Sequence, residues 1–278
     1  MSKIIHGTYY LLLIIIAFLM LIPLIVMFST SVKSDEFLIL KDLGSMAAFW
    51  PGVPEWENYQ QILGDPNMPF LRFLLNTLII VFSIVFLGIG VNSMAAYALS
   101  RLKFRGKGLI IATVIALIII PVESLVIPLL LLVNRLGWID SYHVQIIPFI
   151  AHPFSIFLFY QFFNKIPKSL DDAAKVDGAD FLQIYWRIIL PMSLPVIVTV
   201  AILQGLEFWN SFLWPLMVTR GIEYRPISVA LAQFFGRDPK VWGDIMAFTT
   251  LASLPLLVVY FVFQRWFIQS AIGSSIKG

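Results

Sequence analysis

The 278-residue chain contains no cysteine, only three histidines and few charged residues. The absence of cysteine excludes a disulfide framework. Charged residues make up 13% of the chain, and the mean hydropathy of +0.89 exceeds that of a soluble domain with a charged surface. These shortages argue against a soluble globular protein and favour a polytopic membrane protein.

Motifs for nucleotide binding and hydrolysis are also missing. No G-x-x-x-x-G-K-[ST] phosphate loop occurs, so the chain does not bind ATP by that motif. No H-E-x-x-H or G-x-S-x-G motif occurs, and His6, His143 and His152 are too scattered to predict a metal site. We therefore predict a protein that is not an enzyme and that binds no metal or cofactor itself.

The sequence does contain six long apolar runs. A spanning helix needs roughly 20 mostly apolar residues, because the hydrocarbon core of a bilayer is about 30 Å thick. The runs are continuous, which predicts helices, since strands would need alternating residues and barrel closure. A cleaved signal peptide is an alternative for the first run, but no A-x-A-like site follows it. We predict an all-α fold, one transmembrane domain over residues 1–278, with six transmembrane helices at about 9–27, 71–99, 109–133, 143–163, 196–217 and 245–268.

Lysine and arginine are concentrated in alternate connections between these runs. Arg101, Lys103, Arg105 and Lys107 crowd the short turn after the second run, as expected of a cytoplasmic loop. The alternative, nucleic-acid binding by this turn, is much less favoured beside two spanning helices. The charge pattern places both termini on the cytoplasmic side.

The connection at residues 164–193 is predicted to form two short cytoplasmic helices. Ser169 is placed to cap the first helix, with Asp172 three residues later. Gly178 is expected to end it in a left-handed conformation. The second helix is expected over about 179–189, and Pro191 marks the return toward the membrane.

The first of these helices is short enough to need a partner. A helix of about eight residues is marginal in water by itself, so it must dock on something. Ala173 and Ala174 are small and adjacent, which would let the backbone lie closely in a groove of another protein. An ordinary cytoplasmic loop with helix-forming alanines is the alternative, and spacing alone leaves both open.

Seven residues of this loop stand at a characteristic spacing: Asp172, Ala173, Ala174, Gly178, Ile188, Leu190 and Pro191. The pattern resembles the E-A-A loop of binding-protein-dependent ABC importer permeases, with Asp172 in place of the glutamate. Other segments are similar to the carbohydrate-uptake, maltose-transporter-type branch of that family. They are Glu57-Asn58-Tyr59, Phe208-Trp209-Asn210, Leu213-Trp214-Pro215 and Gln264-Arg265-Trp266-Phe267.

The resemblance implies the type I permease fold of ABC importers, in a multi-pass subunit of the bacterial cytoplasmic (inner) membrane, surrounded by lipid. It implies transport of a sugar or sugar-like polyol by alternating access. The implied partners are a second related permease, two ABC ATPase subunits that bind ATP and Mg, and an extracytoplasmic substrate-binding protein, with no nucleic acid. The implied ATPase-coupling residues are Asp172, Ala173, Ala174, Asp177, Gly178, Leu190 and Pro191.

Polar residues within the spans are candidates for a solute pathway. Burying the polar side chains of Glu123, Glu207 and Asn210 at membrane depth would be costly, so each is a candidate functional residue. With Trp209 and Trp214 they could form a sugar path, because aromatic faces stack on sugar C–H surfaces and acids and amides bind hydroxyls. The alternative is hydrogen bonding between helices or with the partner permease.

Two further features concern the shape of the spans. Pro121 and Pro128 are expected to kink or break the third span around Glu123. Small residues in the second span predict close helix packing rather than a ligand site; they are Gly88, Gly90, Ser93, Ala95 and Ala96.

Three rival functions remain after this comparison. The first is an ABC permease for another small solute, such as an amino acid, a peptide, an inorganic anion or glycerol phosphate. The second is a polytopic membrane enzyme that uses Glu123 and Glu207 as catalytic acids, although these lie on different spans with no supporting motif. The third is an ion-driven secondary carrier, which would transport without any ATPase.

Overall fold

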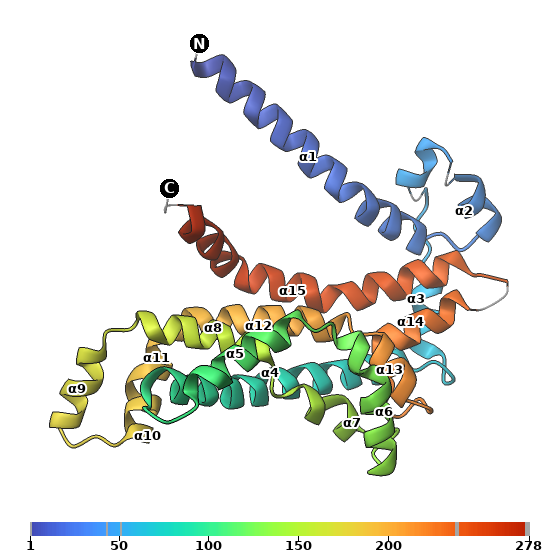
Figure 1. The fold of residues 1–278 in the computed structure, drawn as a ribbon. Helices are drawn as coiled ribbons and strands as arrows, with labels where there is room; N and C mark the ends of the chain where they lie inside the picture. The colour runs from blue at the N-terminus through green and yellow to red at the C-terminus, as the bar shows by residue number, and fades with distance from the viewer. Residues whose placement is uncertain (1, 43, 51, 237–238, 276–278) are drawn as a thin grey trace. The chain divides into compact units, whose positions relative to one another are not determined.

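A computed structural model describes residues 2–42, 44–50, 52–236 and 239–275, and within these ranges the chain is helical with no strand (Figure 1). Of the residues named from the sequence, the side chains of His6, Arg265, Trp266 and Phe267 lie outside the described part. The α-helices are α1 (Ser2–Ser31), α2 (Glu36–Asp42), α3 (Glu57–Gly64), α4 (Phe70–Arg101), α5 (Lys107–Ile119), α6 (Val126–Arg135), α7 (Tyr142–Ile146), α8 (Pro153–Lys165), α9 (Lys168–Val176), α10 (Phe181–Ile184), α11 (Leu190–Met192), α12 (Leu194–Trp209), α13 (Leu213–Val218), α14 (Ile227–Phe235) and α15 (Trp242–Ser275). Short 3-10 turns lie at Met46–Phe49, Val122–Leu125 and Ile147–Phe149, and a π-helical turn lies at Tyr185–Ile189.

The helices account for all six predicted spans. Four segments are long and apolar enough to cross a membrane: Tyr9–Ser31, Phe70–Arg101, Tyr142–Lys165 and Trp242–Gln264. The third span is a bent pair of helices, Lys107–Ile119 with Val122–Arg135 at 98°. The fifth span, predicted at about 196–217, is the helix Leu194–Trp209. It is long enough to cross a membrane only together with Phe181–Met192, which belongs to the predicted cytoplasmic connection and from which it is bent by 75°. Counting each bent pair as one span confirms the all-α, six-span prediction.

The bend in the third span lies at Pro121, as predicted. Ile120 and Pro121 are both extended, and a proline cannot donate the hydrogen bond that would continue α5. Pro128 causes no second break. It is the third residue of α6, so it lies in the first turn, where backbone N–H groups have no helical partner in any case. The expectation that Pro128 also kinks the span was therefore wrong.

Contacts divide the chain into two compact units, which are described separately. Unit 1 contains residues up to 74 and residues 229–258, and unit 2 contains residues 75–228 and 259 onward. In unit 1, Phe248 of α15 packs edge-on against Phe70 at 5.1 Å between ring centroids, and against Phe234 of α14 at 4.9 Å. Most of α1 is exposed and apolar, as expected of a helix that faces lipid or another subunit.

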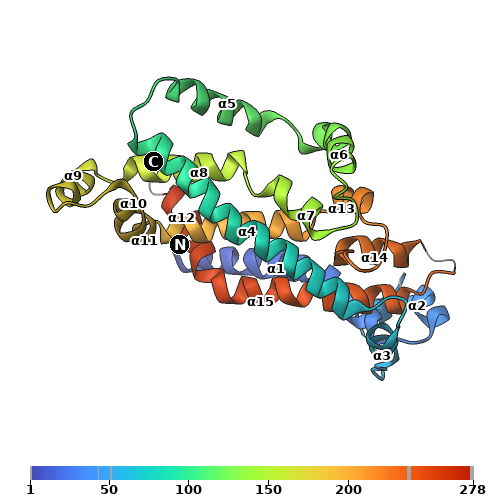
Figure 2. The same cartoon turned by 90° about the horizontal axis from the view of Figure 1, so that it is seen from below.

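In unit 2, α5 and α12 both lie against α8 (Figure 2). The main core of this unit is centred on residues with no solvent exposure, among them Phe159, Phe163, Ile184 and Ile189. Helices α9 and α10 lie at one end of the unit, and α6, α7 and α13 lie at the other (Figures 1 and 2). The loop with the coupling pattern and the polar part of the fifth span therefore belong to the same unit.

Candidate functional site

The first helix of the loop, α9, has an inner and an outer face. Asp171 and Ala174, three residues apart, are buried against the rest of unit 2, whereas Asp172, Ala173 and Val176 are exposed. The two adjacent alanines therefore do not both face outward. Ala174 belongs to the core of this chain, and only Ala173 is available to a partner.

The start of α9 differs from the prediction. The helix begins at Lys168, directly after Pro167, and no side chain caps its first turn. Ser169 is already inside the helix, so it cannot act as the N-cap. Proline fixes a φ of −58° at position 167, which lets the chain enter the helix without a hydroxyl cap.

The end of α9 is as predicted. Gly178 has a φ of +83°, in the left-handed region. Its N–H donates to the Lys175 carbonyl at 3.0 Å, and the Ala179 N–H donates to the Ala174 carbonyl at 2.9 Å. These two bonds form a Schellman motif, which fixes where α9 stops and where the chain turns.

The second helical stretch of the loop is capped by Asp180. Its carboxylate accepts the Gln183 N–H at 2.7 Å, and the Gln183 side chain accepts the Asp180 N–H at 3.0 Å. This reciprocal pair is a capping box. The stretch then continues through the π-helical turn and α11, so Pro191 lies inside it. The change of direction lies two residues later, at Ser193, rather than at Pro191.

A buried ion pair holds α9 to the end of α4. The Arg101 Nε lies 2.8 Å from the Asp171 Oδ2, and the two side chains are only 3% and 8% exposed. The Arg101 Nη2 also donates to the Ile166 carbonyl at 3.0 Å. Sequence reasoning missed this pair, because it treated Arg101 as one of four topology-setting cations and chose Asp172 instead of Asp171. The spacing between Asp171 and Ala174 on one helix face was the available signal.

The outward surface of the loop is apolar as well as charged. Val176 is 87% exposed, and Phe181, Leu182 and Trp186 are each more than half exposed. Lys175 lies 5.7 Å above the Phe181 ring. Apolar side chains clustered on a short loop favour a protein interface. We name the exposed residues from Asp172 to Trp186 the docking surface.

Glu207 lines a groove in the other half of unit 2. The groove has a volume of about 780 Å³, and its lining includes Leu117, Pro121, Leu125, Phe149, His152 and Glu207. Glu207 is exposed, and its Oε2 lies 3.5 Å from the His152 Nε2. Glu123 is also exposed, on the turn after Pro121, but it does not line this groove.

The other predicted pathway residues have structural contacts. Trp209 is buried, and Asn210 caps the end of α12, where its side-chain amide donates to the Leu206 carbonyl at 2.7 Å. Trp214 is buried too, and its indole N–H donates to the Val144 carbonyl at 3.0 Å. Both indole rings are therefore surrounded by side chains of this chain.

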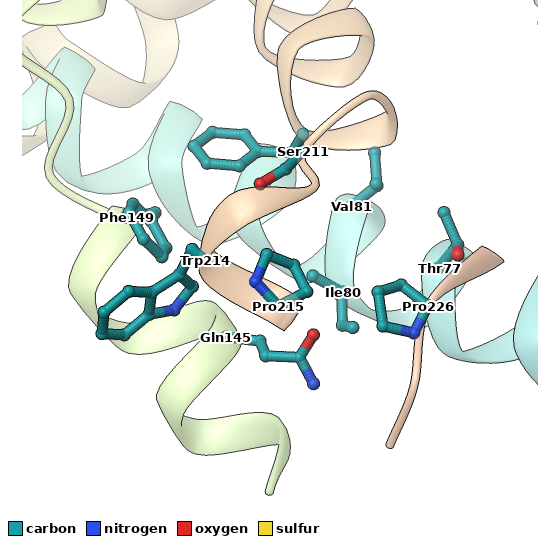
Figure 3. A pocket seen from close by; sticks show the side chains of 10 residues that line it. Thr77, Ile80, Val81, Gln145, Phe149, Ser211, Trp214, Pro215 and Pro226 are labelled. Carbon is teal, nitrogen blue, oxygen red and sulfur yellow. The ribbon is translucent and has the colours of Figure 1, made fainter. Parts of the chain in front are cut away.

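Figure 3 shows the packing around Trp214. The ring lies edge-on against Phe149 at 5.8 Å, with Gln145 and Pro215 close by. The space between these side chains is about 10 Å³, roughly the size of one water molecule. A sugar ring does not fit there.

A buried polar cluster supports the groove, and sequence reasoning did not find it. The Asn92 amide donates to the Ile150 carbonyl at 3.0 Å and accepts the His152 N–H at 2.9 Å. The His152 Nδ1 lies 3.1 Å from the Ser155 Oγ. His152, to which the sequence assigned no role, thus links Asn92 of α4 to Glu207 of α12.

Comparison with known proteins places this arrangement among membrane transport components. Residues 84–272 match the family described as binding-protein-dependent transport system inner membrane component. The chain is 33% identical to the trehalose/maltose transport system permease protein MalG of Thermococcus litoralis, over 95% of this chain and 94% of the relative. It is 31% identical to the arabinooligosaccharides transport system permease protein AraQ of Halalkalibacterium halodurans, over 95% and 93%. A chain in the crystal structure of a bacterial ABC transporter involved in alginate import superposes with a TM-score of 0.81 at 26% identity, covering 95% of this chain and 97% of that one.

Proposed function

The chain belongs to the family of binding-protein-dependent transport system inner membrane components, and we propose that it forms part of the membrane pathway of an ATP-driven importer for a sugar or sugar-like polyol. The docking surface carries this proposal. Its first part is the outer face of α9, a short helix whose other face is fixed by its own chain. A permease subunit of this kind is not an enzyme, and hydrolysis of ATP with Mg belongs to partner subunits.

In the proposed assembly, the outward face of α9 lies in a cleft of an ATPase subunit. Asp172, Ala173 and Asp177 are all exposed on this loop and would contact the cleft. Gly178 ends α9 and sets the angle at which the chain leaves it. Leu190 and Pro191 continue the second helical stretch toward α12. Closure of two ATPase subunits would carry α9 as a rigid body and change the arrangement of the spans.

Family membership supports the remaining partners. A binding protein outside the membrane is implied by the description of the family itself. A second related permease would complete the pathway, because the long apolar face of α1 and the groove beside Glu207 are both open on the isolated chain. Both termini would be cytoplasmic, on the same side as the basic turn that contains Arg105.

The groove is the part of this chain that we assign to the solute. Glu207 and His152 supply hydrogen-bonding groups in an otherwise mostly apolar lining, which suits a polyhydroxy compound. The carboxylate of Glu207 would repel an anionic solute, so a neutral sugar is favoured over a phosphorylated polyol. The functions of the two relatives, trehalose/maltose and arabinooligosaccharide transport, also support a sugar.

One pair of variants tests the docking surface. Val176→Asp places a charge on an 87% exposed position of the loop, and Val53→Asp places the same charge on an 83% exposed position before α3. We expect Val176→Asp to reduce co-purification of the ATPase subunits about tenfold, since one desolvated charge costs more than 1.4 kcal/mol. Val53→Asp should leave it unchanged. Equal recovery from both variants would reject ATPase docking at this surface.

Reconstitution into proteoliposomes tests the function itself. The complete assembly should take up a neutral sugar only when ATP and the liganded binding protein are both present. Uptake by this chain without an ATPase would instead identify a secondary carrier. A binding protein that recognises only anions or amino acids would refute the sugar assignment and leave the importer intact.

A further inference from the structure

Three side chains on one face of α4 hold the cytoplasmic loop. Ser93, Tyr97 and Arg101 are spaced four residues apart, so they form one stripe along the helix. Each contacts a different segment of the loop. We name these three residues the α4 stripe.

The stripe reaches both helical stretches of the loop. Ser93 lies 2.7 Å from the hydroxyl of Tyr185 in the π-helical turn, and both residues are buried. The Tyr97 hydroxyl donates to the Phe181 carbonyl of α10 at 3.0 Å. The rings of Tyr97 and Tyr185 also contact one another, with 5.2 Å between their centroids.

The third contact is a buried ion pair. Arg101 forms the 2.8 Å ion pair with Asp171 of α9 and donates to the Ile166 carbonyl at 3.0 Å. A buried charge whose partner is removed is costly, so this pair holds α9 against α4 much more firmly than an exposed ion pair could. The docking surface lies on the opposite face of the same short helix.

The covalent route from α9 to the membrane is less direct. Along the chain, α9 connects to α12 through a left-handed glycine, the π-helical turn and a 75° bend at Ser193. By contrast, α4 is a single helix of 32 residues without an internal proline, about 48 Å long. A displacement of α9 is therefore transmitted more rigidly through the stripe than along the backbone.

The same helix reaches the groove. Asn92 precedes Ser93 on α4, and its side chain binds the Ile150 carbonyl and the His152 N–H. His152 in turn lies beside Glu207. Helix α4 thus contacts the cytoplasmic loop through the α4 stripe, and it contacts the polar edge of the groove through Asn92.

From this geometry we propose that Arg101 is the positioning residue that couples α9 to α4, and that α4 moves with α9 as one body to reshape the groove beside Glu207. The proposal rests on the function proposed above, because it assumes that an ATPase moves α9. It adds the element that carries the movement and the contact that attaches it. Arg101 itself touches neither nucleotide nor solute.

A charge-exchange experiment in the reconstituted assembly tests the role of Arg101. The single variants Arg101→Asp and Asp171→Arg should each lower sugar uptake per ATP hydrolysed about tenfold, because each leaves two like charges buried together. The double variant, Arg101→Asp with Asp171→Arg, should restore most of the ratio. Arg105→Asp, an equal charge change at an exposed residue of the same turn, should have no effect.

A conservative variant tests the same contact in case the charge-reversed variants fail to fold. Arg101→Lys keeps the charge but replaces the two separate nitrogens that contact Asp171 and Ile166 by one ammonium group with a different geometry, so uptake per ATP should fall about two- to threefold. The ATPase subunits should still co-purify, because the docking surface is unchanged. An unaltered coupling ratio in both Arg101→Lys and Arg101→Asp would overturn the proposal.

A distance measurement tests joint movement without altering the stripe. The chain has no cysteine, so spin labels can be attached at Lys103→Cys, just beyond α4, and Lys168→Cys, in the first turn of α9. The distance between the labels should stay constant to about 2 Å between the nucleotide-free and ATP-bound assemblies. A larger change would show that α9 and α4 move independently, which would refute the proposal.

The importer function and the coupling role of Arg101 are refuted by different results. If the unsubstituted assembly shows no ATP-dependent uptake, the importer function is wrong, and the coupling role of Arg101 falls with it. If the unsubstituted assembly transports and the Arg101 variants keep the normal ratio of uptake to ATP hydrolysis, the coupling role alone is wrong.

Discussion

Asn58 in α3 offers a sharp test of how unit 1 is held together. Its side chain is 4% exposed, and its amide nitrogen donates to two backbone carbonyls, those of Ser31 at 3.0 Å and Lys33 at 2.8 Å. These bonds tie the end of α1 to α3. The substitution Asn58→Asp keeps the shape of the side chain and removes both donated hydrogens.

The expected loss of stability follows from these two bonds. An unsatisfied buried group costs about 1–3 kcal/mol, so losing both donors should lower the free energy of unfolding by about 2–6 kcal/mol. Water cannot easily replace the lost donor, because Gly243 packs directly against this amide. A Cβ at Gly243 would lie only 2.5 Å from the Asn58 nitrogen and 2.8 Å from the Lys33 carbonyl. A carboxylate facing two carbonyl oxygens adds repulsion to the loss.

The assay is denaturation of the purified subunit in mixed detergent micelles, with unfolding monitored by circular dichroism. Gln60→Glu is the matched control, since it makes the same amide-to-acid change on the exposed side of α3. We expect it to change the free energy of unfolding by less than about 0.5 kcal/mol. If Asn58→Asp were as mild as this control, the two hydrogen bonds would not stabilise the protein as reasoned here.

Three other predictions concern unit 2. Gly178→Ala has steric room but must adopt a φ of +83°, so it should cost about 1–2 kcal/mol, fray the end of α9 and lower uptake per ATP hydrolysed in proteoliposomes. Gly88→Ala would place a Cβ within 3.2 Å of two oxygen atoms, so it should reduce the free energy of unfolding of the subunit by about 1–3 kcal/mol and lower its thermal midpoint. The control Gly90→Ala meets nothing within 4 Å and should be neutral. Ala174→Leu should destabilise the subunit itself by a similar amount, whereas Ala173→Leu should leave its thermal midpoint unchanged and reduce ATPase co-purification.

Sequence patterns predicted the spans well, because bilayer thickness and internal hydrogen bonding leave few alternatives. The second span, predicted at 71–99, is α4 at Phe70–Arg101. The break in the third span could be read from Pro121. The end of the fifth span at Trp209 could not be predicted, because the apolar residues continue past it and Asn210 is at most a weak stop signal.

The candidate site was predicted less completely, since its contacts join residues far apart in the chain. The pairing of Arg101 with Asp171 spans 70 positions. The spacing of Asp171 and Ala174 indicates that Asp171 faces inward, but nothing near it in the sequence identifies Arg101 as its partner. The position of Gly178 could be predicted because a left-handed helix end depends on local geometry. For the same reason the error at Ser169 is instructive. A hydroxyl three residues before an acid fits the capping pattern, but the N-cap is Pro167, so the helix starts two residues earlier than predicted.

The geometry of α9 explains why its sequence contains two acids followed by two alanines. Successive residues of a helix point about 100° apart, so a pair of identical neighbours divides between two faces. Asp171 turns inward to Arg101 and Asp172 outward, while Ala174 enters the core and Ala173 stays exposed. In the assembly that we propose, α9 connects an ATPase to this chain and needs this division, because a helix bound on one face alone would follow either the partner or its own chain. The repeated residue types therefore supply two contacts, and only the outer one is expected to involve another subunit.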